Sequence, residues 1–119
     1  MLINLTNHPY AQWSPAQKAA AKVWGETMDL PFPAIFGGAS EKDIELLASN
    51  MVSQVMALHP DAVCCQGEMT LTFRIVTLLK ARGIRCVAAC SEREVHETPK
   101  PDGTVLKTTV FAFVRFREY

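Results

Sequence analysis

Short apolar segments alternate along this chain with helical stretches, and that alternation restricts its fold more than any other feature of the sequence. Four segments have the length and apolar content of strands, the second of them weakly: residues 2–5, 26–30, 62–65 and 85–89. Three helical stretches separate them: residues 15–24, 41–56 and 69–82. Such an alternation predicts a parallel sheet whose crossover connections are right-handed.

The helical stretches carry their own start and stop signals. Ser14 with Gln17, and Ser40 with Asp43, have the spacing of a capping box at a helix N-terminus. In the second stretch, apolar residues recur at intervals of three and four: Ile44, Leu47, Ala48, Met51, Val52, Val55 and Met56. A glycine follows the first and the third stretch, where glycine commonly ends a helix.

The last quarter of the chain has a different pattern. Residues 95–98 and 105–116 are rich in β-forming residues and flank the turn sequence 99–103, so they are predicted to form a hairpin. We therefore expect one α/β domain over residues 1–119. The expected fold is a three-layer Rossmann-like (flavodoxin-like) one, with a mostly parallel five-stranded sheet in the order 2-1-3-4-5 and an antiparallel last strand.

The predicted last strand is apolar on both faces over residues 110–116. In this topology the first helix covers one face of the sheet and the other two helices cover the opposite face. One side of strands 3, 4 and 5 is then left without a helix. Because a strand that is apolar on both faces needs cover on both, we expect a homodimer that buries this side. The alternative is that the first helix tilts far enough to cover it.

Composition narrows the class of protein. The 119 residues carry 12 Lys and Arg against 12 Asp and Glu, and a net charge of zero argues against binding to long nucleic acids or to a membrane surface. No apolar run approaches the roughly 20 residues that a membrane span needs. The N-terminal segment is too short and too polar for a signal peptide, so we expect a cytoplasmic protein.

The four cysteines, Cys64, Cys65, Cys86 and Cys90, do not have the spacing of a metal site. Cys64 and Cys65 point to opposite faces of a strand, and Cys86 and Cys90 lie about 13 Å apart along an extended chain. We expect reduced and mostly buried thiols. Neither a metal nor a cofactor is expected at the site.

Ligands of a parallel sheet bind beyond the carboxyl ends of its strands, at the point where the strand order reverses. Three polar turns are expected there: residues 6–8, 66–70 and 90–93. They contain one imidazole (His8), carboxylates, hydroxyls and an arginine (Arg93). This set suits a phosphate-bearing ligand and acid–base chemistry.

Each of these residues also has a purely structural interpretation. His8 fits a hydrogen bond within its turn, and Glu68 fits the first turn of a helix, where the helix dipole favours an anion. Arg93 fits a surface ion pair with a neighbouring glutamate, and Ser91 and Thr70 fit turns or helix caps.

The remaining titratable residues contribute little to this crevice. His59 and His96 are interpreted as structural or solvated, and Asp29, Asp61 and Asp102 are expected far from it. The glycine-rich phosphate and dinucleotide motifs are absent, as are the zinc-protease and α/β-hydrolase signatures.

Short segments over nearly the whole chain resemble a group of small CRISPR-associated proteins of type III systems. They are LINLTNHP at residues 2–9 with Gln17 and its alanines, GEMTLTF at 67–73, SER at 91–93 and FVRFREY at 113–119. Related Rossmann-like dimers in that setting are ring nucleases or binders of cyclic oligoadenylate second messengers. The resemblance implies that the chain binds cyclic tetra-adenylate, or a close relative, across a dimer two-fold axis.

The resemblance also implies a metal-independent ring nuclease that switches off type III antiviral signalling, in which the ribose 2′-hydroxyl attacks its own phosphate. His8 would be the general acid or base and Arg93 would stabilise charge, while Glu68 would orient His8 or help activate the hydroxyl. The positions expected to bind the ligand are Thr6, Asn7, Gly67, Met69, Thr70, Ser91 and Glu92.

Two alternatives stay open. The same crevice could bind a cyclic oligoadenylate without cutting it and so lower its free concentration. A flavodoxin-like protein of unrelated function would share only the architecture.

Overall fold

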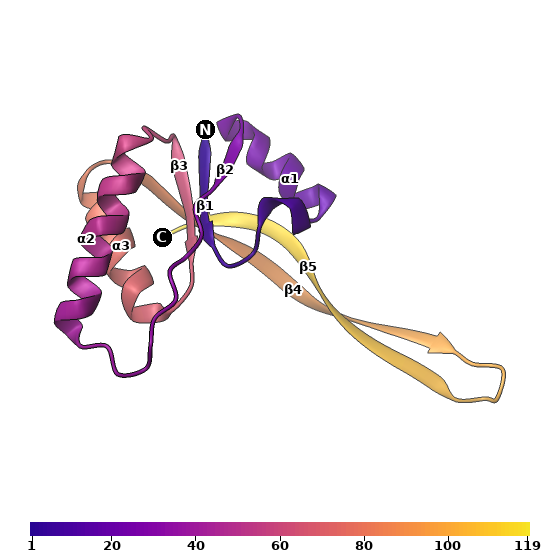
Figure 1. The fold of residues 1–119 in the computed structure, drawn as a ribbon. Coiled ribbons are helices and arrows are strands. Elements are labelled where there is room, and N and C mark those ends of the chain that lie inside the picture. Colours follow the sequence, from indigo (N-terminus) through magenta and orange to yellow (C-terminus); the bar gives the residue numbers. More distant parts are fainter.

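Five strands form one sheet in the order β2-β1-β3-β4-β5 in the computed structural model, which describes residues 1–119 (Figure 1). Their bounds are Leu2–Thr6 (β1), Thr27–Asp29 (β2), Ala62–Gln66 (β3), Arg85–Pro99 (β4) and Val105–Glu118 (β5). Strands β1 to β4 pair in parallel, whereas β5 runs antiparallel to β4. The predicted α/β fold, strand order and antiparallel last strand are confirmed.

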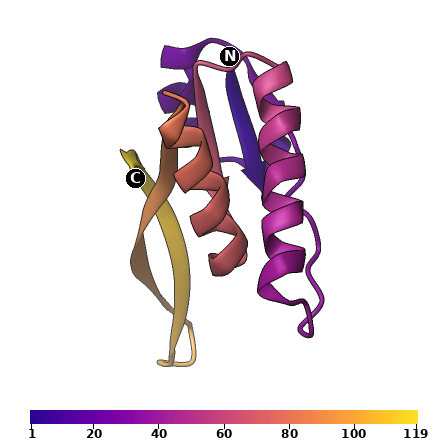
Figure 2. The same cartoon turned by 90° about the vertical axis from the view of Figure 1, so that its left-hand side faces the viewer.

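The helices form one layer on each face of the sheet (Figure 1, Figure 2). α1 (Pro15–Ala21) covers one face, and α2 (Glu41–Ala57) and α3 (Met69–Ala81) pack side by side on the other. Two 3₁₀ turns, η1 (Tyr10–Gln12) and η2 (Lys22–Trp24), flank α1, so the first predicted helix ends as a 3₁₀ turn. No helix of the chain combines the length and the apolar character that crossing a membrane requires.

Side chains of the central strands alternate between two apolar clusters, one on each face of the sheet. The larger cluster includes Ile3, Leu5, Val63 and Cys65 with buried residues of α2 and α3. The smaller cluster, on the α1 face, consists of Leu2, Trp13, Ala21, Ala62, Cys64 and Val87. Because β1 and β3 are buried on both faces, they read as nearly continuous apolar runs, which is typical of parallel strands.

The hairpin of β4 and β5 leaves the sheet as a long two-stranded projection (Figure 1). We call residues 91–113 the arm. It makes the chain extended, with a radius of gyration of 17.4 Å where a compact domain of this length has about 13–14 Å. All residues of the arm except Ala112 and Phe113 are exposed.

The expected polar turn at residues 90–93 does not exist. β4 continues without a break to Pro99, with a bulge between Cys90 and Ser91. A bulge bends a strand and increases its twist without ending it, so β4 turns away from the sheet while it stays paired with β5. The prediction of a separate strand over residues 85–89 was therefore wrong.

The base of β5 is covered by the α1 layer. The ring centroid of Phe116 lies 5.9 Å from that of Trp13 and 5.5 Å from that of Trp24. The alternative in which the first helix covers the last strand is thus correct at this point. Further out, Phe111 is 74% exposed, so the uncovered apolar surface of β5 is confined to the arm and its junction with the sheet.

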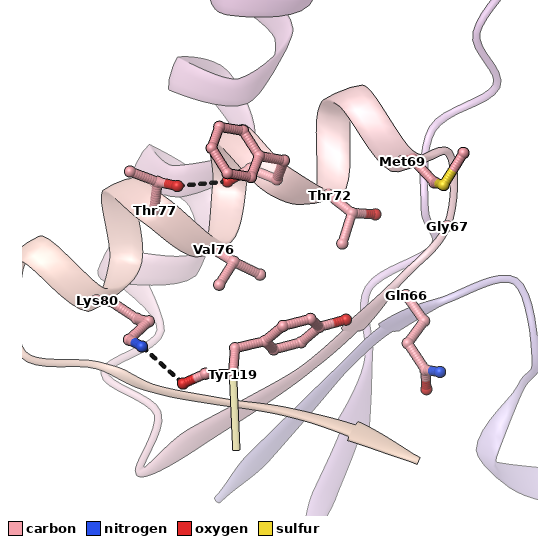
Figure 3. A pocket seen from close by; sticks show the side chains of 9 residues that line it. Gln66, Gly67, Met69, Thr72, Val76, Thr77, Lys80 and Tyr119 are labelled. Atoms are coloured by element: carbon pink, nitrogen blue, oxygen red, sulfur yellow. Dashed lines mark hydrogen bonds between the residues drawn. The ribbon is translucent and has the colours of Figure 1, made fainter. Parts of the chain in front are cut away.

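The end of the chain is anchored beneath α3 (Figure 3). The Tyr119 hydroxyl donates a hydrogen bond to the carbonyl oxygen of Cys65 at 2.5 Å, and Lys80 Nζ donates one to the carbonyl oxygen of Tyr119 at 2.6 Å. Burial raises the pKa of Tyr119 to about 12, so its phenol keeps its proton at neutral pH.

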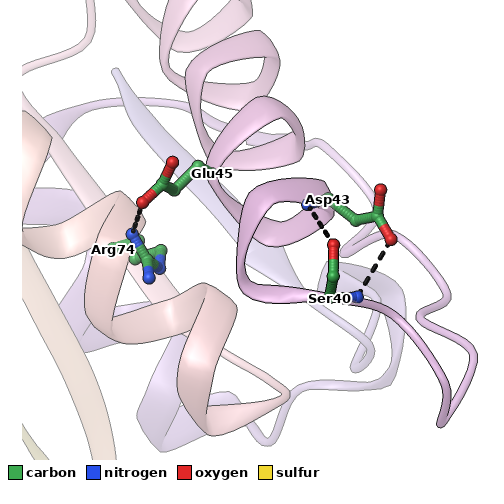
Figure 4. Close-up of polar contacts among 4 residues, drawn as sticks. All are labelled: Ser40, Asp43, Glu45 and Arg74. Atoms are coloured by element: carbon green, nitrogen blue, oxygen red, sulfur yellow. Dashed lines mark hydrogen bonds and ion pairs between the residues drawn. The ribbon is translucent and has the colours of Figure 1, made fainter.

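The predicted capping box closes the N-terminus of α2 (Figure 4). Ser40 Oγ accepts a hydrogen bond from the Asp43 main-chain nitrogen at 3.1 Å, and Asp43 accepts one from the Ser40 nitrogen at 2.9 Å. A hydrogen-bonded ion pair of 2.9 Å between Arg74 and Glu45 joins α3 to α2. These contacts fix the helix pair that covers one face of the sheet.

Candidate functional site at the carboxyl edge of the sheet

A cavity of about 870 Å³ lies between the carboxyl edge of the sheet, the α1 layer and the inner part of the arm. Its polar lining consists of Thr6, Asn7, His8, Gln12, Ser14, Gln17, Gln66 and Ser91. Three aromatic side chains also line it: Trp13, Phe111 and Phe113. The lining contains no carboxylate, no lysine and no arginine. We call this space the edge cavity.

The edge cavity lies where the strand order reverses between β1 and β3, the position at which open α/β sheets bind ligands. Its volume falls in the range of about 300–1,000 Å³ that is typical of small-molecule sites. The predicted location of the site is therefore a real hollow in the molecule.

Asn4 organises the turn that carries His8. Its side chain is 1% exposed and donates hydrogen bonds to the His8 carbonyl oxygen at 2.9 Å and to Asp29 Oδ1 at 2.8 Å. Its oxygen accepts a hydrogen bond from Thr6 Oγ1 at 2.7 Å, and Thr6 Oγ1 accepts one from the His8 nitrogen at 3.1 Å. The network satisfies every polar atom of the buried amide, as a stable buried polar group requires.

Asp29 lies beside this turn, contrary to expectation. β2 runs parallel to β1 with Asp29 in register with Asn4, which carries the carboxylate to the same edge of the sheet. There Asp29 also accepts a hydrogen bond from the Tyr10 nitrogen at 3.1 Å. The carboxylate is therefore a structural partner of the turn and lies outside the edge cavity.

Trp13 gives the His8 turn a second anchor. Its indole nitrogen donates to the His8 carbonyl oxygen at 3.0 Å, and its ring lines the edge cavity. The carbonyl oxygen of His8 thus accepts two hydrogen bonds, whereas its imidazole makes no hydrogen bond within the chain, and the residue lines the edge cavity. An imidazole with both nitrogens free can transfer protons to or from a bound ligand.

Gln66 closes the floor of the edge cavity. Its side-chain nitrogen donates to the Ala89 carbonyl oxygen at 3.3 Å, and its oxygen accepts from the Ala89 nitrogen at 2.8 Å. This pair of hydrogen bonds replaces main-chain pairing where β3 ends and β4 bends away. Gln66 was part of a predicted turn, but its role in joining two strands was not predicted.

Only half of the predicted capping box forms at α1. Ser14 Oγ accepts from the Gln17 nitrogen at 3.2 Å, and the Gln17 side chain is buried and lines the edge cavity. The sequence pattern identified Gln17 as a helix cap, and the structure adds a polar group to the site.

Five of the predicted site residues lie around the edge cavity: Thr6, Asn7, His8, Gly67 and Ser91. The other five do not line it: Glu68, Met69, Thr70, Glu92 and Arg93.

Glu68 is the N-cap of α3 and does not contact His8. Its carboxylate accepts hydrogen bonds from the Thr70 nitrogen at 3.0 Å, the Thr70 hydroxyl at 2.6 Å and the Leu71 nitrogen at 2.9 Å. These bonds, with the Thr70 hydroxyl first, lower the pKa of Glu68. The structural interpretation of Glu68 and Thr70 matches this geometry, since both serve the helix start.

Arg93 and Ser91 lie on the same face of the arm, because alternate residues of a strand point to the same side. Ser91 is in register with Phe113 and Arg93 with Phe111, and both aromatic rings line the edge cavity. Arg93 therefore lies one step beyond the outer rim of the cavity. Glu92 points to the opposite side of the arm.

Gly67 is needed for packing rather than for an unusual backbone conformation. A Cβ atom at this position would lie 2.5 Å from the ring of Phe32, which is itself buried in the larger apolar cluster. The close approach of Phe32 explains why the turn after β3 carries a glycine.

A second cavity of about 570 Å³ lies on the other side of the same turn, between α3 and Tyr119 (Figure 3). We call it the α3 cavity. Gln66 and Gly67 line both cavities, and Met69, one of the predicted ligand-binding residues, lines only this one. Its presence was not predicted, because its residues read as an ordinary amphipathic helix.

The cysteines are free thiols, and three of the four are buried. Burial raises the pKa of Cys64 and of Cys65 to about 12, and that of Cys86 to about 11, so these thiols are protonated and unreactive at neutral pH. Nowhere in the chain do three His, Cys, Asp or Glu residues form a group that could hold a metal ion.

A family model described as the Uncharacterized protein MJ1673 family matches residues 1–117. No curated protein and no solved structure matches the chain.

Proposed function

We propose that this chain, which belongs to the MJ1673 family, binds a cyclic oligoadenylate in the edge cavity and cleaves it without a metal. The observation that carries the proposal is the free imidazole of His8, which lines a polar cavity at the strand-order reversal on a turn held by Asn4 and Trp13. The resemblance to small CRISPR-associated proteins supplies the ligand class.

The lining of the edge cavity supports a nucleotide ligand. Aromatic rings such as Trp13 and Phe111 stack on bases of any sequence, and hydroxyl and amide groups bind ribose and phosphate oxygens. Arg93, beyond the rim, supplies the nearest cation of the arm for a phosphate. A neutral chain with a polar cavity suits a small ring better than a long polyanion.

The proposed reaction needs positioning and proton transfer only. The 2′-oxygen of a ribose forms a bond to the adjacent phosphorus, and the bond from phosphorus to the 5′-oxygen breaks, leaving a 2′,3′-cyclic phosphate and a 5′-hydroxyl. His8 takes the proton of the 2′-hydroxyl or delivers one to the leaving 5′-oxygen. Arg93 stabilises the charge on the phosphoryl oxygens, and Ser91 and Asn7 hold phosphates.

Glu68 has an indirect part in this proposal. Its carboxylate is engaged by the first turn of α3, so it fixes the turn beside Gly67 rather than orienting His8. This assignment replaces the expectation that Glu68 acts on the imidazole or on the attacking hydroxyl.

We also propose that two chains form a homodimer through their arms. A two-stranded hairpin without further support is marginally stable in water, yet the arm exposes large apolar side chains: Val95, Val105, Leu106, Val110 and Phe111. Isologous packing of two arms on the face that carries Ser91, Arg93 and Val95 would cover part of this surface. It would also bring two edge cavities to face one ring of two-fold symmetry.

The second candidate is a binding protein that sequesters the ring. One observation favours it: the edge cavity contains no carboxylate, so His8 has no acidic partner within the lining.

Incubation of the purified protein with cyclic tetra-adenylate in EDTA tests the proposal. Chromatography is expected to resolve linear products that end in a 2′,3′-cyclic phosphate, formed by the wild type and not by His8→Ala. His96→Ala, which removes an exposed imidazole on the other face of the arm, is the matched control and should keep full activity. Intact ring bound by the wild type would identify a sequestering protein, and intact unbound ring would overturn the proposal.

A further inference from the structure

Thr72, one of the residues that line the α3 cavity, carries the one buried side-chain polar atom of the chain that has no hydrogen-bond partner, its Oγ1. Thr72 is 9% exposed, and its side chain extends from α3 toward the cavity and Tyr119 (Figure 3). A buried hydroxyl without a partner is destabilising, so native proteins rarely keep one without use. By contrast, the hydroxyl of Thr77 on the same helix has a hydrogen-bond partner, since it donates to the Phe73 carbonyl oxygen at 2.7 Å.

The walls of the α3 cavity suit a flat ring. The Tyr119 ring lies across from Val76 and Thr72 (Figure 3). Phe73 and Met69, both largely exposed, also belong to the lining of the cavity. Tyr119 is held at two points. Its hydroxyl donates to the carbonyl oxygen of Cys65, and its own carbonyl oxygen accepts from Lys80. A preformed apolar slot with an aromatic wall stacks a planar heterocycle well.

The hydroxyl gives the slot a polar edge. A threonine hydroxyl both donates and accepts, and in a helix its χ1 angle has two accessible rotamers, so Oγ1 can turn toward a group in the cavity. Adenine presents a donor and an acceptor side by side, at its amino group and its ring nitrogen N7. Thr72 can therefore pair with one edge of an adenine whose face lies on Tyr119.

The two cavities are neighbours. Gln66 and Gly67 line both, so only the turn between β3 and α3 separates the edge cavity from the α3 cavity. The Gln66 side chain points away from α3, toward Ala89, and leaves the α3 cavity to the apolar side chains and Thr72 (Figure 3).

We infer that the α3 cavity binds an adenine base of the same ligand whose ribose and phosphate occupy the edge cavity, with Thr72 as the residue that recognises the base edge. The identity of the base rests on the proposed function. The slot, its aromatic wall and its unpartnered hydroxyl are properties of this chain.

Thr72→Val tests the inference, with Thr108→Val, at an exposed threonine of β5 that lines neither cavity, as the matched control. Cyclic tetra-adenylate is titrated into each protein while the methyl signals of Val76 are followed by NMR. Thr72→Val is expected to weaken binding about fivefold to tenfold, the loss of one hydrogen bond. Thr108→Val should bind as the wild type does, and the Val76 signals of the wild type should shift on binding.

The melting temperature separates recognition from a structural role. Thr72→Val removes an unpartnered buried hydroxyl, so it should leave the melting temperature of the ligand-free protein unchanged or raise it. A lower melting temperature, or equal affinity of Thr72→Val and wild type with unmoved Val76 signals, would overturn the inference and leave the proposed function standing. Wild-type protein that does not bind the ring would overturn both.

Discussion

The side-chain amide of Asn4 lies 2.9 Å from the main-chain carbonyl oxygen of His8, so a fully buried strand position controls the exposed turn that carries the imidazole. The same amide nitrogen donates to Asp29, and its oxygen accepts from Thr6. The position of His8 thus depends on Asn4 and Thr6 of β1 and on Asp29 of β2, which the pairing of the two strands brings together, and not on the turn alone.

Asn4→Leu should lower the free energy of unfolding by about 1–3 kcal/mol, because it removes the three hydrogen bonds that the buried Asn4 amide makes with His8, Asp29 and Thr6. Chemical denaturation measures this loss. Asn7→Leu, at an exposed position two residues after the strand's last core residue, is the control and should cost far less. Equal stability of the two variants would show that the network does not hold the turn.

Gly67→Ala should destabilise the chain by about 1–3 kcal/mol, since the added methyl group would overlap the Phe32 ring at 2.5 Å. Gly37→Ala, where a methyl group would meet no atom within 4 Å, is the matched control. Phe32→Leu should recover part of the loss in the Gly67→Ala background. A melting temperature of Gly67→Ala equal to that of the wild type would contradict the packing role.

Stability should fall in alkaline solution. Burial raises the pKa of Cys64 and of Cys65 from 9.0 to about 12, and that of Tyr119 from 10.0 to about 12. Because the folded-state values lie above the unfolded ones, this contribution to stability is complete below pH 9 and is lost as the pH rises toward 12.

Denaturation midpoints at about pH 8 and about pH 11 measure this slope. The double variant Cys64→Ala, Cys65→Ala should have a flatter profile, since it removes two of the four groups whose pKa burial raises, the other two being Cys86 and Tyr119. Identical midpoints at the two pH values in the wild type would contradict the prediction.

Val95→Asp should convert a dimer into a monomer. Val95 is 54% exposed and lies on the arm face that also carries Ser91 and Arg93, so a carboxylate there would oppose isologous packing. Sedimentation should give twice 13.2 kDa for the wild type and 13.2 kDa for the variant. Leu106→Asp, on the opposite arm face, is the control, and a monomeric wild type would refute the dimer.

The strand order and the main helix caps follow from local patterns. Alternation of strands and helices predicts the topology, and the spacing of Ser40 and Asp43 predicts a capping box that forms in full. Such features depend on residues close together in the sequence, which is why they can be predicted without a structure.

The arm and the polar network depend on pairing between distant residues. Residues 91–94 carry a hydroxyl and three charges and resemble a turn, yet a bulge and pairing with β5 keep them in a strand. Asp29 meets Asn4 only because β2 and β1 share a register, which no local pattern reveals. A polar residue inside the apolar run LINLT was the one available signal for Asn4.

Binding in the edge cavity is tested most directly by a titration with cyclic tetra-adenylate, followed by the fluorescence of Trp13 in a Trp24→Phe background. Trp13 is the tryptophan that lines the edge cavity. A saturable change at one ring per two chains is expected, because stacking of a base changes the indole environment. The same titration with Ser91→Glu, which introduces a carboxylate that repels the phosphates of the ring, should show a much weaker response. No change in Trp13 fluorescence at any concentration of ring would contradict binding in the edge cavity.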